Sequence, residues 1–84
     1  MRDELRNHFL QGLLRELQAA ERNAAKGKTI VDKQRQRAKR ICDISGCDTL
    51  ATRTADTFLK VIEDTQRILE DHVDLMKREV AEAS

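Results

Sequence analysis

Residues 49–82 read TLATRTADTFLKVIEDTQRILEDHVDLMKREVAE, and this stretch contains neither proline nor glycine. Along it, one set of mostly small or apolar side chains recurs at alternating intervals of four and three residues, which is the spacing of a coiled-coil seam. The members of this predicted seam are Ala51, Ala55, Phe58, Ile62, Thr65, Leu69, His72 and Met76. The pattern predicts one long C-terminal helix over about 49–82, capped at its start by Asp48 or Thr49.

Two shorter helices are expected before the long one. Over about 3–26, apolar residues follow helical spacing, and Gly27 then offers a residue that can end a helix. Thr29 and Asp32 resemble a capping box that opens a second helix over about 30–45, which Gly46 ends. The apolar face of the first helix comprises Leu5, Phe9, Leu13, Leu17, Ala20 and Ala24, and that of the second comprises Ile30, Val31, Gln34, Ala38, Ile41 and Cys42.

The expected architecture is all-α and forms a single domain over 1–84, in which two shorter helices and one long C-terminal helix form a helical bundle. A helix of about 35 residues is about 50 Å long, whereas one of about 15 residues is about 22 Å long. One short helix cannot cover the long one, so we expect the long helices to pair between chains in a homodimer. Thr65 and His72 fit this expectation, because polar seam residues set register and oligomeric state. A further row, Val61, Ile68 and Leu75, makes the face wider than a two-stranded coiled coil needs.

The composition excludes several other classes of protein. Hydrophobic residues make up 39% and charged residues 37% of the chain, which has no Pro, Trp or Tyr. Collagen-like chains, disulfide scaffolds and β-sandwiches need glycine periodicity, dense cysteine or aromatic-rich strands. No apolar run is long enough to cross a membrane and no signal peptide is evident, so we expect a cytoplasmic protein. In a reducing compartment Cys42 and Cys47 are interpreted as small apolar fillers, although a disulfide across the turn is geometrically conceivable.

The net charge of +1 conceals a strongly basic middle segment. Residues 22–40 carry eight basic side chains and one acidic one, Asp32, whereas residues 41–84 carry ten acidic and five basic side chains. Clustered basic groups on one helix favour an acidic protein partner or phosphate, or an intersubunit salt-bridging role. The candidate partner- or phosphate-binding residues are Lys26, Lys28, Lys33, Arg35, Arg37, Lys39 and Arg40.

Catalytic chemistry has no recognisable motif in this chain. His8 and His72 fall on different predicted helices, and no glycine-rich phosphate loop or metal-binding pair of histidines is present. The spacing of Cys42 and Cys47 lacks the two-residue knuckle of most structural zinc sites. We therefore expect neither an enzyme nor a cofactor or metal site.

The segment 38–55 loosely resembles the helix-turn-helix of DNA-binding regulators. Ile41, Cys42, Gly46 and Cys47 stand at the offsets that this motif reserves for an apolar residue, a small residue, the turn glycine and a following apolar residue. The resemblance implies that the second helix would enter the major groove of double-stranded DNA. The residues that would contact bases are Thr49, Thr52 and Arg53, whereas Asp48 and Asp56 would face phosphates unfavourably.

Three hypotheses for the function follow from these features. The first is a small non-enzymatic binding protein, a regulator or inhibitor that docks on a larger acidic protein through its basic helix and bundle surface. The second is a double-stranded DNA-binding regulator that uses the degenerate helix-turn-helix. The third is a structural bundle subunit, whose basic segment pairs with the acidic helix of a neighbouring copy.

Overall fold

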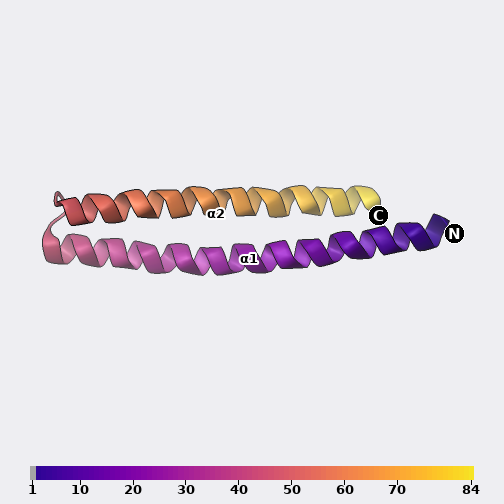
Figure 1. Ribbon diagram of the computed structural model, residues 1–84, viewed down its shortest axis with the longest axis horizontal. Helices are drawn as coiled ribbons and strands as arrows, with labels where there is room; N and C mark the ends of the chain where they lie inside the picture. The colour runs from indigo at the N-terminus through magenta and orange to yellow at the C-terminus, as the bar shows by residue number, and fades with distance from the viewer. Residues whose placement is uncertain (1) are drawn as a thin grey trace.

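The computed structural model describes residues 2–84 and contains two helices, α1 (Arg2–Ser45) and α2 (Leu50–Ala83). They lie side by side and antiparallel, so that both ends of the chain are at one end of the molecule and the turn is at the other (Figure 1). The resulting helical hairpin is a rod of 65 × 14 × 13 Å. The prediction of an all-α chain is confirmed, whereas the prediction of three helices that form a bundle is wrong.

The predicted break between 26 and 30 does not occur, because Gly27 is an interior residue of α1. Thr29 does not cap a helix, since its Oγ1 donates to the carbonyl oxygen of Ala25 one turn earlier, at 3.3 Å. A Cβ at position 27 would overlap Oε1 of Gln66 and lie 3.1 Å from its Cδ. Gly27 is therefore explained by the close approach of α2, and not by a turn.

The turn between the helices confirms the predicted stop at Gly46. Gly46 has a φ of +90°, which favours glycine, and its N–H donates to the carbonyl oxygen of Cys42 at 2.9 Å. Of the two predicted caps, Asp48 and Thr49, Thr49 is the N-cap of α2, because its Oγ1 accepts from the N–H of Thr52 at 3.3 Å. Oγ1 of Thr52 in turn donates to the carbonyl oxygen of Gly46 at 2.7 Å, which ties the start of α2 to the end of α1.

Cys42 and Cys47 are joined by a disulfide across this turn, with their Cα atoms 4.4 Å apart. The interpretation of these residues as two unlinked apolar fillers is therefore wrong. Gly46 reverses the chain between them and brings the two thiols together, which the sequence spacing alone did not require.

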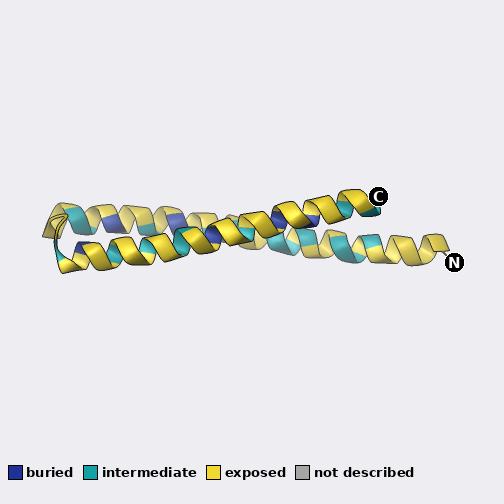
Figure 2. Ribbon diagram, turned by 90° about the horizontal axis from the view of Figure 1, so that it is seen from above, coloured by how far each residue is buried: buried dark blue, intermediate teal, exposed yellow. Residues whose placement is uncertain are grey.

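The two helices pack through one seam with regular coiled-coil spacing, which we call the inner seam. Its members on α1 are Leu10, Leu13, Leu17, Ala20, Ala24, Gly27, Val31, Gln34, Ala38 and Ile41. Its members on α2 are Thr52, Ala55, Leu59, Ile62, Gln66, Leu69, Val73, Met76, Val80 and Ala83. All are buried or half-buried, and they form the band of blue and teal along the hairpin (Figure 2). The core is therefore one narrow contact between two helices.

The predicted seam of the long helix is half right. Ala55, Ile62, Leu69 and Met76 belong to the inner seam, whereas the alternate members Ala51, Phe58, Thr65 and His72 are exposed. The predicted seam and the inner seam of α2 both have intervals of four and three residues, and the row Ala55, Ile62, Leu69 and Met76 belongs to both. Beside this shared row, Leu59 and Val73 on one side pack against α1, whereas Phe58 and His72 on the other side are left uncovered.

Candidate functional site

The uncovered side of α2 is a second seam, which we call the outer seam. Its members recur at intervals of four and three residues and are all exposed: Thr54, Phe58, Val61, Thr65, Ile68, His72 and Leu75. Side chains as large as Phe58 and Ile68 remain 53% and 68% exposed. A helix with two adjacent coiled-coil seams has apolar surface for two packing partners, and the hairpin supplies one of them.

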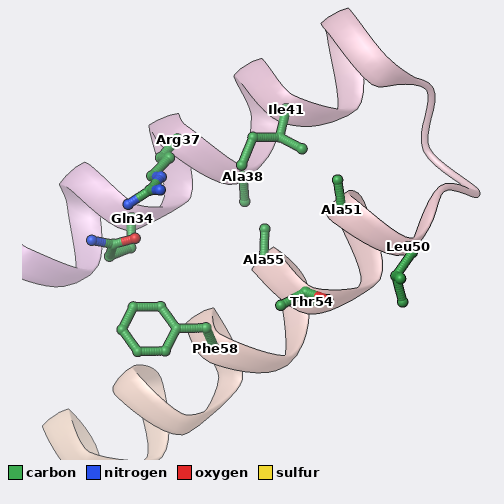
Figure 3. Close-up of a pocket in the computed structure, with 9 residues that line it drawn as sticks. All are labelled: Gln34, Arg37, Ala38, Ile41, Leu50, Ala51, Thr54, Ala55 and Phe58. Carbon is green, nitrogen blue, oxygen red and sulfur yellow. The ribbon is translucent and has the colours of Figure 1, made fainter.

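Three hollows follow one another along the side of the hairpin that the outer seam borders, and together we call them the groove. Nearest the turn, a hollow of about 600 Å³ lies between the two helices, with Ile41 and Phe58 among its walls (Figure 3). Next come hollows of about 230 Å³ beside Ile30 and Thr65 and of about 300 Å³ beside His72. Their α1 walls include Glu16, Asn23, Ile30 and Arg37, which lie on one face because they are seven residues apart.

The opposite edge of the hairpin is charged. Arg35 of α1 forms an ion pair with Glu63 of α2 at 3.2 Å, and its other guanidinium nitrogen lies 3.8 Å from Asp32. Farther along the same edge, Glu21, Glu70 and Lys77 border a shallow polar hollow. The two long edges therefore differ in chemistry, since one is an apolar groove and the other carries pairs of charges.

The seven candidate basic residues do not form one surface. Lys26, Lys33 and Arg40 are seven residues apart on the row of α1 next to the groove, and Arg37 lines the groove itself. We call these four residues the basic rim. Lys28 and Arg35 lie on the charged edge, and Lys39 lies on the outward side of α1 next to that edge, one turn after Arg35.

The candidate base-contacting residues belong mainly to the turn. Thr52 is buried at 3% exposure, and its hydroxyl bonds Gly46, so it is not available to a base. Thr49 is half-buried as the cap of α2, whereas Arg53 is exposed. In addition, α1 and α2 run antiparallel, whereas the helices of a helix-turn-helix cross at about 90–120°. The structure does not have the geometry that the resemblance implied.

Gln66 is the polar residue that the sequence analysis missed. Its Nε2 donates to the carbonyl oxygen of Ala24 at 2.7 Å and to Oε1 of Glu70 at 3.3 Å, while its own Oε1 is buried without a hydrogen-bond partner. The sequence did contain a signal. Gln66 continues the spacing of Leu59 and Val73, and a polar residue on such a row is a candidate for setting register.

The described residues offer no further site of recognisable chemistry. Among residues 2–84, no three or more His, Cys, Asp or Glu side chains gather closely enough to hold a metal ion. Neither helix has a stretch long and apolar enough to cross a membrane in this same range. Comparisons of the chain with protein-family models, with curated proteins and with solved structures find no match. The case for function therefore depends on the groove and its charged borders.

Proposed function

We propose that this chain is a non-enzymatic binding module whose groove associates with α-helices of a protein partner. The observation that carries the proposal is the outer seam, a regular row in which Phe58, Val61, Ile68 and Leu75 are large and apolar and which no other part of the described chain covers. An exposed apolar row at intervals of four and three residues is the form in which helices recognise helices. Occlusion of a partner's helical surface would suffice for a regulator or an inhibitor.

The exposed surface of the hairpin supports the need for a partner. A folded monomer of 9.7 kDa is expected to expose about 5,100 Å², whereas this chain exposes 6,828 Å². Its radius of gyration is 19.0 Å, against about 12 Å for a compact chain of this length. The apolar residues that are buried within residues 2–84 are Val31, Ala38, Val73 and Met76, and each of them keeps 4–7% of its surface exposed. A core of this size is small for independent stability, so association through the groove would complete it.

The basic rim indicates the chemistry of the partner. Lys33 and Arg37 border the apolar surface, so a helix that lies in the groove brings its own flanking side chains next to them. Opposite charges across an interface steer association and fix register. The proposed partner helix is therefore apolar on one face and acidic beside it. This retains the acidic protein partner of the sequence hypothesis and limits the contact to four of the seven basic residues.

Site-specific photo-crosslinking tests this proposal. A benzophenone side chain at Val61 places the reactive group on the outer seam, and the same group at Lys60 provides a matched control on another face of α2. We expect a crosslink from position 61, mapped to a helix with acidic residues beside the site of attachment, and none from position 60. Equal crosslinking from both positions, or none from position 61, would contradict the proposal. A salt series with labelled double-stranded DNA tests the alternative DNA hypothesis. No contact in the structure favours that hypothesis, so we expect no binding of the DNA.

A further inference from the structure

We infer that the helices in the groove belong to a second copy of this chain, packed head to tail so that its turn lies beside the chain ends of the first. This inference rests on the proposed function, because it names the partner that the groove binds. It is carried by the charges along the groove, by the pattern of the outer seam and by the area that remains exposed.

The face of the hairpin that carries the groove and the outer seam has opposite charge in its two halves. Toward the turn, the basic rim supplies Arg37 on the α1 row that lines the groove and Lys26, Lys33 and Arg40 on the row beside it, and no acidic residue is on those rows or on the outer seam there. Toward the chain ends, the corresponding rows carry Glu16, Glu79 and Glu82, with Arg2 as the basic residue. A twofold axis perpendicular to the rod places the basic half of each copy over the acidic half of the other. A self-complementary face of this kind is what a twofold interface requires.

The outer seam has the same twofold character. Val61 and Leu75 stand seven residues before and after Ile68, so antiparallel pairing of two α2 helices can place Ile68 on its counterpart and Val61 on Leu75. Ile68 is level with the middle of α1, because its neighbours Gln66 and Leu69 approach Ala24 and Gly27. From that level, Lys33 and Glu16 lie at nearly equal distances along α1 in opposite directions, so the same axis brings Lys33 of one copy toward Glu16 of the other.

The alternative twofold arrangement, with both turns at the same end, fits less well. It would place α2 of one copy over α1 of the other, so that Phe58 and Val61 would cover the charged groups of the basic rim. Burial of unpaired ammonium and guanidinium groups against apolar side chains is unfavourable. The head-to-tail arrangement instead sets the outer seams of the two copies against each other and brings Lys33 of each copy toward Glu16 of the other.

The exposed area agrees with an interface between two copies. The chain exposes about 1,700 Å² more than a compact monomer of its mass. Burial of a comparable area on each of two copies would amount to about 3,400 Å², which is within the range of about 2,000–5,000 Å² for obligate homodimers. The homodimer expected from the sequence is thus proposed with another architecture, a pair of hairpins that share the groove.

Sedimentation equilibrium and thiol crosslinking of the full chain test this inference. We expect the mass of a dimer for the wild type, and we expect Ile68→Cys to crosslink to itself with a short bismaleimide, whereas Arg67→Cys, on another face, does not. The Cys42–Cys47 disulfide stays oxidised during the reaction, so that the introduced thiol is the reactive one. A monomeric wild type overturns the inference. So does a mixture in which Ile68→Cys crosslinks to Lys26→Cys but not to itself, because that pair marks the arrangement with both turns at one end.

Charge reversal gives a second, independent measurement. Lys33→Glu is expected to weaken self-association about tenfold, since like charges would then face each other across the interface. Glu16→Lys in the same chain is expected to restore it, whereas Arg67→Glu serves as a control that leaves it unchanged. Lack of restoration by the double variant overturns the pairing. If the wild type is monomeric and position 61 crosslinks to another protein, the proposed function stands and this inference fails. If position 61 crosslinks to nothing, both fail.

Discussion

Nε2 of Gln66 donates a 2.7 Å hydrogen bond to the carbonyl oxygen of Ala24, and this contact fixes the level at which α2 lies against α1. The amide fits there because position 27 has no side chain, and a Cβ would overlap Oε1 of Gln66. Leu69 closes the same site, with its Cδ1 3.4 Å from the position of that Cβ. The pairing of a glycine on one helix with a glutamine on the other is a specific contact in the middle of a seam that is mostly apolar.

Substitution of Gly27 tests this relationship. Gly27→Ala gains about 1 kcal/mol of helix propensity, but the displaced Gln66 amide loses its bond to Ala24 and stays in the seam, at a cost of about 2 kcal/mol. We expect a net loss of about 1 kcal/mol in the free energy of unfolding. Urea denaturation followed by circular dichroism measures it at fixed protein concentration, since association makes stability depend on concentration.

Two further variants control that measurement. Nothing lies within 4 Å of a Cβ built at Gly12, so Gly12→Ala is expected to raise stability by about 0.5–1 kcal/mol. In a chain that already carries Gln66→Ala, Gly27→Ala is expected to become stabilising, because the obstructing amide is gone. If Gly27→Ala lowers stability equally in both backgrounds, Gln66 is not the residue that Gly27 accommodates.

The hydroxyl of Thr52 is expected to matter for the turn. Thr52→Val keeps the shape of the buried side chain and removes its 2.7 Å bond to the carbonyl oxygen of Gly46, for an expected loss of about 1 kcal/mol. Thr57→Val is the matched control, since that hydroxyl is exposed and bonds within its own helix to Arg53. Thermal unfolding of both variants gives the comparison, and a Thr57→Val loss as large as that of Thr52→Val would contradict this role.

Reduction of the Cys42–Cys47 disulfide is expected to destabilise the hairpin without unfolding its helices. The bond closes a short loop, and the chain-entropy relation gives a contribution of about 2 kcal/mol for a loop of this size. The Cys42→Ser, Cys47→Ser double variant should match the reduced wild type and should not respond to reductant. Mass spectrometry of the alkylated protein confirms the bond. Free thiols in protein purified without reductant would contradict the presence of the bond, and equal stability with and without it would contradict the expected contribution.

The ion pair between Arg35 and Glu63 is expected to contribute little. Their side chains are 57% and 36% exposed, and exposed pairs of this kind contribute less than about 1 kcal/mol. Arg35→Gln should therefore change the free energy of unfolding by less than about 0.5 kcal/mol and leave the dimer mass unchanged. Lys33→Glu, two residues away, is expected to weaken association, so a larger effect of Arg35→Gln on assembly would assign the interface to the charged edge.

Much of the fold could be predicted from the sequence, and the errors have physical causes. Helical spacing located most of the helical residues, although it divided α1 into two helices, and Gly46 and Thr49 marked the turn correctly. Gly27 was misinterpreted because glycine ends helices and also permits their close approach. The spacing from Ala24 through Gly27 to Val31 continues without a shift in phase, which favoured one helix.

The candidate site was harder to predict, because periodicity shows that a face is apolar but not which partner covers it. The row that contains Ile62 and Leu69 forms a valid seam with the residues on either side of it. Only the position of α1 shows that Leu59 faces inward and Phe58 outward. Helical spacing likewise places Lys33 and Arg35 on different flanks of one helix, but only the position of α2 shows that Lys33 borders the groove and that Arg35 pairs with Glu63.

The placement of both chain ends opposite the turn gives the hairpin a direction (Figure 1). A group attached near the start of α1 is separated by nearly the full 65 Å of the rod from anything held at the turn, and one attached near the end of α2 by about 50 Å. Head-to-tail pairing would cancel that direction, because each end of the assembly would then display one turn beside one pair of termini. The pair would act as a symmetrical spacer, with equivalent attachment points at both ends.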